Sequence, residues 1–231
     1  MDNAATATAT VIPTGDAHLQ ADTVIPTQPA GVVVFAHGSG SSRHSPRNRA
    51  VAQVLNRTGM ATVLADLLTA DEERRDAESR RLRFDITLLA ERVLGIVDWL
   101  RTAPETRTLP IGLFGASTGA AAALVAAAAR PDVVQAVVSR GGRPDLAGAA
   151  LGDVQAPTLL LVGERDDVVL QLNAEAHAAM PGVAQLRVIP NAGHLFEEPG
   201  ALDQVAGLAA SWFDTYLREA DQATRWPPSP A

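Results

Sequence analysis

The sequence contains no cysteine and no lysine, so all 19 of its basic residues are arginines. Without cysteine, disulfides, thiolate nucleophiles and cysteine-ligated zinc sites are excluded. Without lysine, the P-loop lysine that contacts nucleotide phosphates and the Schiff base that holds pyridoxal phosphate are excluded as well. Several classes of enzyme are therefore ruled out before any motif is considered.

Positive charge is also scarce. The 231 residues carry 19 basic and 26 acidic side chains, which gives a formal net charge of −7. This balance argues against nucleic acid or an anionic membrane as the principal partner and favours a neutral or small substrate. With 47% hydrophobic residues, the chain is long enough to bury one substantial core. No linker or internal repeat is visible, so we expect a single domain over residues 1–220.

Long uninterrupted apolar segments are missing too. Residues 1–4 have neither the positive region nor the apolar core of a secretory signal, so we expect a cytoplasmic protein. Residues 109–129 are uncharged, but a proline and three glycines interrupt them, which favours a strand and a buried helix over a membrane span. The proline-rich end cannot continue a helix, and we expect residues 221–231 to form a loose tail.

Apolar runs of strand length alternate with helical patterns along most of the chain, which predicts a doubly wound, mainly parallel α/β sheet. At the start, β-rich stretches at 6–13 and 18–26 flank a Thr-Gly-Asp-Ala turn and predict an antiparallel hairpin. The charged segment 71–83 is predicted to be a solvated face. The other predicted strands are 30–37, 61–66, 110–115, 133–139, 157–163 and 184–190, and the predicted helices are 46–58, 85–102, 117–130, 169–179 and 200–219.

No cap domain is expected over this sheet. Fewer than twenty residues separate the predicted strands at 133–139 and 157–163, which is too few for a separate lid. We therefore expect an open site.

The pentapeptide Gly115-Ala116-Ser117-Thr118-Gly119 lies where a predicted strand turns into an alanine-rich helix. It matches the Gly-x-Ser-x-Gly pattern of a nucleophile elbow, in which strand and helix backbones come so close that only small residues fit beside the serine. Gly115, Ala116 and Gly119 satisfy this demand. The pattern predicts Ser117 as a nucleophile, although a glycine-rich turn of this kind also occurs as a plain connection.

A serine nucleophile needs an imidazole base, and the imidazole needs an acid that holds its tautomer and stabilises its charged form. On a doubly wound sheet these groups come from loops at the carboxyl ends of strands, and after an elbow their chain order is serine, acid, histidine. The strand at 157–163 runs into a loop with three carboxylates, and the strand at 184–190 is followed by His194. Residue types, order and strand ends together predict His194 as the base.

The acid has more than one candidate. Asp166 and Asp167 are adjacent, so only one of them faces His194, and we rank Asp166 first. Glu164 in the same loop and Asp145 after the preceding strand are the alternatives.

The oxyanion that forms during acyl transfer needs two preorganised backbone N–H donors. Elbow geometry supplies one from Thr118. We expect the second from the Gly38-Ser39-Gly40 loop and choose the Ser39 N–H. The alternatives for this loop are a flexible turn and a phosphate site, the latter weak without lysine. His37 and His44 fit no triad order and are predicted to be structural.

Taken as a set, these motifs resemble the α/β-hydrolase superfamily, and within it the small serine hydrolases related to dienelactone hydrolase. The resemblance covers about residues 31–217 and rests on the segments Phe35–Ser42, Gly115–Gly119, Gly163–Asp166 and Ala192–Phe196.

The resemblance implies an α/β-hydrolase fold with Ser117 as nucleophile, Asp166 as acid by its Gly-x-x-Asp spacing, and His194 as base. It also implies Ser39 and Thr118 as oxyanion donors. Dienelactone hydrolases proper use a cysteine nucleophile, which this chain lacks. Their substrate is therefore not carried over.

We expect a serine hydrolase that cleaves carboxylic esters of small or exposed acyl groups through an acyl-enzyme on Ser117. Its partner is a small-molecule ester, and it needs no cofactor or metal; whether it forms a homo-oligomer is left open. The alternatives are a thioesterase or acyltransferase and a noncatalytic ligand-binding protein on the same scaffold. Arg140 and Arg143 are candidates for binding a substrate carboxylate, with structural salt bridges as the ordinary alternative.

Overall fold

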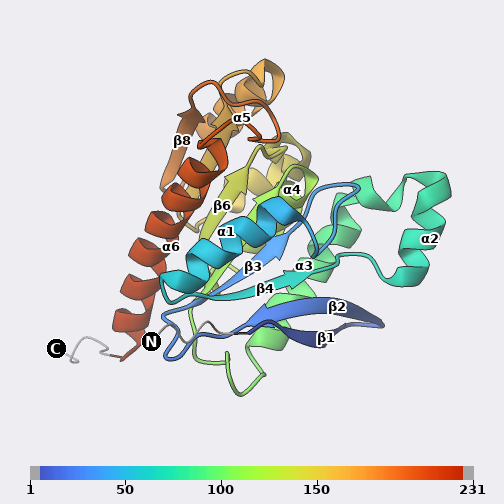
Figure 1. Ribbon diagram of the computed structural model, residues 1–231, viewed down its shortest axis with the longest axis vertical. Helices are drawn as coiled ribbons and strands as arrows, with labels where there is room; N and C mark the ends of the chain where they lie inside the picture. The colour runs from blue at the N-terminus through green and yellow to red at the C-terminus, as the bar shows by residue number, and fades with distance from the viewer. Residues whose placement is uncertain (1–5, 226–231) are drawn as a thin grey trace.

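The structure, a computed structural model, describes residues 6–225 and contains an eight-stranded sheet in the order β1-β2-β4-β3-β5-β6-β7-β8 (Figure 1). β1 (Thr8–Thr14) and β2 (Ala17–Val24) form the expected hairpin, and β2 also pairs antiparallel with β4. The remaining neighbours pair in parallel, which confirms the predicted fold class. The other strands are β3 (Val32–Ala36), β4 (Ala61–Ala65), β5 (Ile111–Ala116), β6 (Val134–Arg140), β7 (Thr158–Gly163) and β8 (Ala184–Ile189).

Helices cover both faces of the sheet. α1 and α6 lie on one face, and α3, α4 and α5 lie on the other. Among residues 6–225, no helix is both long and apolar enough to cross a membrane. The helices are α1 (Pro46–Arg57), α2 (Ala70–Ser79), α3 (Ile86–Leu100), α4 (Thr118–Ala129), α5 (Asp167–Ala179) and α6 (Ala201–Arg225), with short 3₁₀ segments η1 (Leu82–Phe84) and η2 (Pro144–Asp153).

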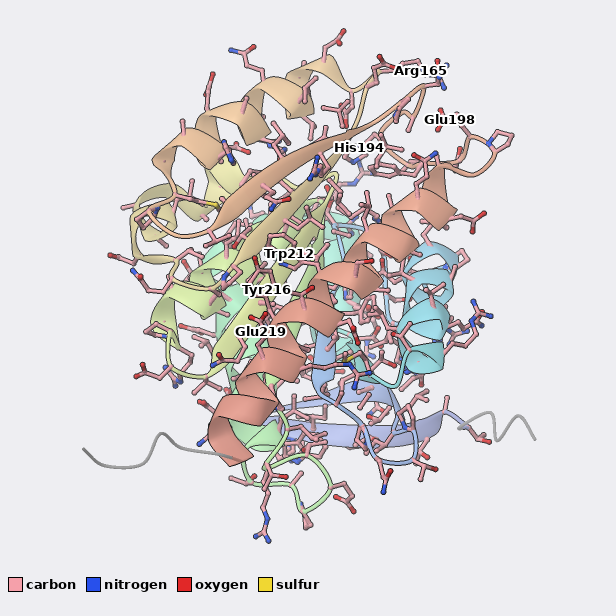
Figure 2. The ribbon with its side chains drawn as sticks, turned by 90° about the vertical axis from the view of Figure 1, so that its left-hand side faces the viewer. Arg165, His194, Glu198, Trp212, Tyr216 and Glu219 are labelled. Carbon is pink, nitrogen blue, oxygen red and sulfur yellow. The ribbon has the colours of Figure 1, made fainter. Side chains whose placement is uncertain are left out.

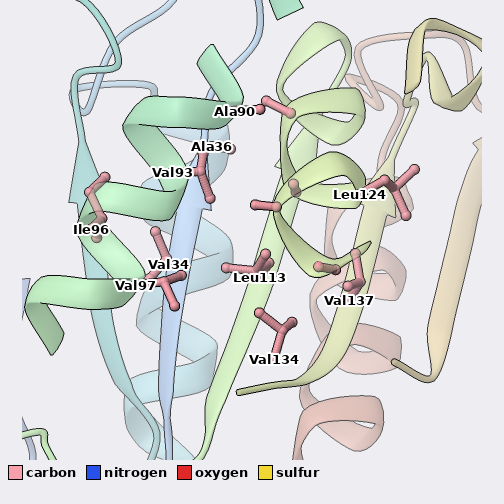
Figure 3. Packing of buried hydrophobic residues seen from close by; sticks show 14 of the residues in the cluster. Val34, Ala36, Ala90, Val93, Ile96, Val97, Leu113, Leu124, Val134 and Val137 are labelled. Atoms are coloured by element: carbon pink, nitrogen blue, oxygen red, sulfur yellow. The ribbon is translucent and has the colours of Figure 1, made fainter. Parts of the chain in front are cut away.

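The central strands are buried on both faces because each face packs against helices. Alternate side chains of a strand point to opposite faces. Val34 and Leu113 belong to the cluster under α3 and α4, as Figure 3 shows. Phe35 and Phe114 belong to the cluster under α1 and α6, and their ring centroids are 4.8 Å apart. The central sheet is therefore held firmly from both sides, which fixes the positions of its strand ends.

The start of α1 follows from local sequence. The Ser45 hydroxyl accepts a hydrogen bond from the Asn48 N–H, and Pro46 occupies the first helical turn. This agrees with the predicted helix start.

The charged segment 71–83 forms an ordered element that the sequence analysis missed. It folds into α2 and η1, and α2 projects beyond the sheet in Figure 1. Thr69 and Glu72 make a reciprocal capping box at its start. Most of α2 is solvated as predicted, but Asp76 is buried and accepts hydrogen bonds from Leu82 N–H and the Arg83 guanidinium.

The β5–α4 segment and the end of α6 can be compared with the predicted segments. Residues 109–129 form β5 and α4, as expected in place of a membrane span. α6 runs to Arg225, so residues 221–225 are helical and are not part of a loose tail. Residues 226–231 lie outside the described part of the chain. Only η2 lies between β6 and β7, so no cap domain is inserted there.

Candidate active site

Ser117 occupies a strained turn between β5 and α4. Its backbone angles are φ 51° and ψ −122°, a conformation that costs a non-glycine residue about 1–3 kcal/mol. A Cβ added at Gly115 would lie 2.3 Å from Ala120 Cα, and one at Gly119 would lie 2.2 Å from the carbonyl oxygen of Ala36. The small residues of the motif are therefore required by close backbone contact, and the geometry is that of a nucleophile elbow.

His194 and Asp166 form a hydrogen-bonded pair at the ends of β8 and β7. The distance from His194 Nδ1 to Asp166 Oδ2 is 2.6 Å. When Nδ1–H donates to the carboxylate, Nε2 carries the lone pair that a general base needs. The His194 side chain is 41% exposed and that of Asp166 is 16% exposed, so the imidazole faces solvent while the carboxylate is largely covered. This opening agrees with the expectation of an open site.

One main-chain and one side-chain hydrogen bond join the loop after β7 to the loop after β8. The Arg165 N–H donates to the Ala192 carbonyl at 2.9 Å. The Glu164 carboxylate accepts from the Asn191 N–H at 2.7 Å. Glu164 therefore ties the two loops together and is not the acid that faces the base.

Glu198 adds a second tie between the same loops. Its Oε1 accepts the Gly193 N–H at 3.0 Å and is also bonded by the Arg165 guanidinium. Figure 2 shows Arg165, Glu198 and His194 at the same end of the molecule. Hydrogen bonds from the backbone amides of Glu198 itself and of Gly193 hold the pKa of the Glu198 carboxyl below its ordinary value. Glu198 therefore holds Gly193, the residue next to His194, in place.

The end of β6 lies between the elbow and the base. The Ser117 N–H donates to the Arg140 carbonyl at 3.3 Å. The next residue, Gly141, has φ +50°, and a Cβ added there would lie 3.5 Å from His194 Cε1. Ser117 and His194 therefore flank the same two residues. Within residues 6–225 the Ser117 hydroxyl makes no hydrogen bond, so no hydrogen bond joins Ser117 to His194 in this structure.

The two predicted oxyanion donors lie together, but one is already engaged. The Ser39 N–H donates to the Thr118 hydroxyl at 2.9 Å, which differs from the free donor that we expected. The Thr118 N–H belongs to the first turn of α4, where amides have no partner within the helix. Gly38 places this loop against the elbow, since a Cβ there would lie 3.0 Å from Ser117 Cβ.

His37 supports the loop and agrees with its predicted structural role. Its Nδ1 is 3.0 Å from the Gly38 carbonyl, and its Nε2 accepts the Leu67 N–H at 3.1 Å. Burial lowers the pKa of His37, and this outweighs the opposing hydrogen bond to Gly38 and the nearby acidic charges. The ring is therefore held neutral. His44 is exposed and contacts Arg49, also away from the base.

The remaining acid candidates are used elsewhere or face solvent. Asp145 binds the Arg143 guanidinium through two hydrogen bonds of 2.8 and 2.7 Å. The Asp145 carboxylate is therefore paired with Arg143 and not with His194, whose partner is Asp166. Asp167 is exposed at the first position of α5. In the part of the chain that the structure describes, no group of three or more His, Asp or Glu side chains is placed to hold a metal ion.

Sequence reasoning missed the residues that act between loops. Glu198 and the Thr118 hydroxyl make their contacts across segments that are distant in the chain or adjacent only after folding. No periodicity or motif in the sequence indicates such contacts, whereas the small residues of the elbow are visible as a Gly-x-Ser-x-Gly pattern.

Three comparisons place the chain among known proteins. A family model described as the dienelactone hydrolase family matches residues 19–222. A solved dienelactone hydrolase from Anabaena variabilis is 56% identical, with a TM-score of 0.91 over 93% of this chain and 99% of that one. An α/β serine hydrolase without a lid from Xanthomonas campestris is 20% identical, with a TM-score of 0.73 over 97% of each chain, and this likeness shows the fold alone.

One relative that is not named as a hydrolase is more than twice as long as the segment it shares with this chain. A Mycobacterium tuberculosis protein provisionally named a phosphoribosyl transferase is 62% identical over 193 residues. The match takes in 84% of this chain but 43% of the relative, so the chain spans less than half of that protein's length. The name describes the longer protein and is not transferred.

The family assignment rests on the extent of these matches. The family model spans β2 to α6, which includes the elbow and both loops that carry Asp166 and His194. The Anabaena variabilis enzyme matches nearly the whole chain in sequence and in fold. The chain belongs to the dienelactone hydrolase family.

Proposed function

We propose that this protein is a serine hydrolase that cleaves carboxylic esters of small or exposed acyl groups through an acyl-enzyme on Ser117. The observation that carries the proposal is the 2.6 Å pair of His194 and Asp166 on the far side of residues 140–141 from the elbow. Membership of a hydrolase family supports the general class of reaction.

In the first half of the reaction, Ser117 Oγ attacks the ester carbonyl while His194 Nε2 takes the hydroxyl proton. Asp166 keeps Nδ1 protonated and stabilises the imidazolium. The tetrahedral intermediate then collapses, and His194 returns the proton to the departing alcohol. The contact between Ser117 and His194 closes on substrate binding, since catalytic hydrogen bonds are often long before the substrate is present.

In the second half, water attacks the acyl-enzyme. His194 takes a proton from the water, the carbonyl carbon passes through a second tetrahedral intermediate, and Ser117 Oγ leaves with that proton. The products are the carboxylic acid and the free enzyme.

Both intermediates carry an oxyanion that needs hydrogen-bond donors. The Thr118 N–H at the start of α4 supplies one and benefits from the helix dipole. The Ser39 N–H supplies the other by exchanging its bond to the Thr118 hydroxyl for one to the oxyanion. A full charge competes well with a neutral hydroxyl for an amide donor.

A fluorophosphonate probe tests the proposal directly, because it phosphonylates only an activated serine. We expect labelling at Ser117 and turnover of p-nitrophenyl acetate. Ser117→Ala should abolish both while leaving the thermal unfolding transition near that of the wild type. A folded wild-type protein that neither reacts with the probe nor hydrolyses the ester would overturn the enzymatic proposal and favour a ligand-binding role. Faster cleavage of a matched thioester than of the ester would favour a thioesterase.

A further inference from the structure

Asn173 is a polar residue at a core position of α5. The buried residues of this helix are Val169, Asn173 and Ala176, which recur at helical spacing on one face. Asn173 is 0% exposed, and its buried Oδ1 atom has no hydrogen-bond partner within residues 6–225. Because an unpaired buried polar atom is costly, an apolar side chain would suit this position better. Packing alone therefore does not explain the amide.

The amide nitrogen of Asn173 makes two hydrogen bonds. It donates to the Val169 carbonyl in the same helix at 2.8 Å and to the Gly142 carbonyl at 2.9 Å. The second bond runs from α5 to the segment that follows β6. Gly142 is buried, and a buried carbonyl needs a donor. Asn173 supplies that donor from an element distant in the chain.

The segment that Asn173 holds, Gly141–Arg143, lies between the nucleophile and the base, and we call it the spacer segment. At one end, the Arg143 N–H donates to the Ser117 carbonyl at 3.1 Å. At the other end, a Cβ added at Gly141 would lie 3.2 Å from the His194 carbonyl oxygen and 3.5 Å from Cε1 of its ring. The position of the spacer segment therefore bears on how Ser117 and His194 lie relative to each other.

The helix that carries Asn173 also carries the acid. Asp166 is the N-cap residue of α5, and its carbonyl accepts the Leu170 N–H at 2.8 Å. Asn173 lies about two turns further along the helix. One helix thus contacts the base through the carboxylate of Asp166 and the spacer segment through the amide of Asn173.

We propose that Asn173 is a positioning residue: its hydrogen bond to Gly142 holds the spacer segment so that Ser117 and His194 can meet when the substrate binds. The inference rests on the proposed esterase function for its catalytic meaning. The hydrogen bond itself can be tested without turnover.

Asn173 acts without touching the substrate. The cavity beside the elbow has a volume of about 540 Å³ and is lined by the Gly38-Ser39-Gly40 loop, the start of α1 and residues of α2, among others. Asn173 is buried under α5, away from this lining. Its loss should therefore lower kcat and leave KM nearly unchanged, because substrate binding is preserved while the geometry needed in the transition state is not.

Asn173→Leu removes both donors and keeps a branched side chain. We expect kcat for p-nitrophenyl acetate and the rate of fluorophosphonate labelling at Ser117 to fall about tenfold or more, with KM changed less than about twofold. Asn56→Leu is the matched control, because the Asn56 amide also donates two bonds, to the Met60 carbonyl and the Thr62 hydroxyl, both at 3.0 Å. It should keep the wild-type rates. Wild-type kcat and labelling in folded Asn173→Leu overturn the proposal.

The pH profile of Asn173→Asp is a readout that a loss of packing would not move. A protonated carboxyl can donate to the Gly142 carbonyl, whereas an ionised one can only accept. The wild-type rate should rise with pH as His194 loses its proton and then level off. In Asn173→Asp we expect the rate to decline again at higher pH, where the introduced carboxyl ionises with a pKa raised by burial. Circular dichroism at each pH monitors folding. A profile of wild-type shape overturns the proposal, even where Asn173→Leu fails to fold.

Hydrogen exchange separates this proposal from the esterase itself. The Gly141 N–H donates to the Leu161 carbonyl at 2.7 Å, and the Arg143 N–H bonds Ser117, so both amides report on the spacer segment. We expect Asn173→Leu to speed their exchange about tenfold or more, and Asn56→Leu to leave it unchanged. Faster exchange without any labelling of the wild type would support the hydrogen-bond anchor and overturn the esterase. Unchanged exchange in folded Asn173→Leu overturns the anchor.

Discussion

At Gly119 a single hydrogen atom decides whether the elbow can form. A side chain there would collide with the carbonyl oxygens of Ala36 and His37, at 2.2 and 2.5 Å, and backbone atoms have little freedom to move. We expect Gly119→Ala to lower the free energy of unfolding by at least about 2 kcal/mol and to abolish probe labelling. Chemical denaturation measures the first effect.

Gly207 provides the matched control. It lies within α6, and a Cβ added there would meet no atom within 4 Å. Because alanine is the better helix former, Gly207→Ala should raise the free energy of unfolding by about 0.5–1 kcal/mol. If the two substitutions had similar effects, the close contact at the elbow would not be the cause.

His37, next to the Gly38-Ser39-Gly40 loop, makes the stability of the fold depend on pH. Its pKa is lowered by burial, so the unfolded chain binds a proton more readily than the folded one. Stability from this residue is complete above pH 6.5, its ordinary pKa, and is lost as pH falls from there through the lowered pKa of the folded state. The expected slope is at most about 1.4 kcal/mol per pH unit.

His37→Gln should flatten that slope, because a neutral amide can accept the Leu67 N–H at every pH. Denaturation at a series of pH values above the range of carboxylate titration provides the measurement. His44→Gln, at an exposed position, serves as the control and should keep the wild-type slope. Equal slopes in all three proteins would contradict the role assigned to His37.

Residue type, chain order and position at strand ends together carried the prediction of Ser117, Asp166 and His194. They did not determine that the Ser39 amide would bond the Thr118 hydroxyl. The sequence also did not distinguish the surroundings of Arg140 from those of Arg143. In the structure the Arg143 guanidinium bonds Asp145, whereas Arg140 is buried.

At the level of elements, the two loops that carry Asp166 and His194 act as one unit held by Glu198. Removing the carboxylate in Glu198→Ala breaks contacts to Gly193 and Arg165. Because small misplacements of a catalytic group are costly, we expect the rate of probe labelling at Ser117 to fall about tenfold. The thermal unfolding transition should change little, since the lost bonds lie near the surface.

Glu198→Gln distinguishes positioning from general weakening. Its amide oxygen still accepts the Gly193 N–H, so labelling should recover most of the wild-type rate. Glu175→Ala removes an exposed carboxylate of α5 and is the control. If the glutamine variant is as slow as the alanine variant, orientation by the Gly193 hydrogen bond is the wrong explanation.

Helix α2 shows why some elements escaped prediction. Its ten residues carry charges on nearly every side, so no apolar stripe indicates a helix. What holds it is a capping box at Thr69 and the burial of Asp76 against Arg83. Burial raises the pKa of Asp76, but hydrogen bonds from Arg83 and the amides of Leu82 and Arg83 outweigh it and leave the pKa lowered. Such polar contacts become visible only once the chain is folded.

For the molecule as a whole, the order of the strands and of the helices other than α2 was predictable, and the arrangement of the sheet followed only in outline. Uninterrupted apolar runs predict buried parallel strands, and the Thr14–Ala17 turn between two β-rich stretches predicts the hairpin. That β2 pairs with β4 instead of β3 depends on contacts between distant segments. The end of α6 was missed because the prolines after residue 225 favour an earlier end of the helix, although four of residues 220–225 (two alanines, a glutamine and an arginine) are good helix formers.

The absence of an inserted cap sets the size of substrate that the whole fold favours. Only η2 connects β6 to β7, the His194 side chain is 41% exposed, and the adjoining cavity is lined largely by serines, glycines and charged groups. A long acyl chain would gain little, because burial of apolar surface is what rewards each added methylene. Among p-nitrophenyl esters assayed below their critical micelle concentrations, kcat/KM should therefore be highest for acetate or butyrate and lowest for palmitate. Ser117→Ala gives the background rate for each ester. A maximum at palmitate would mean that an apolar channel forms on binding, and the open site would then not represent the working enzyme.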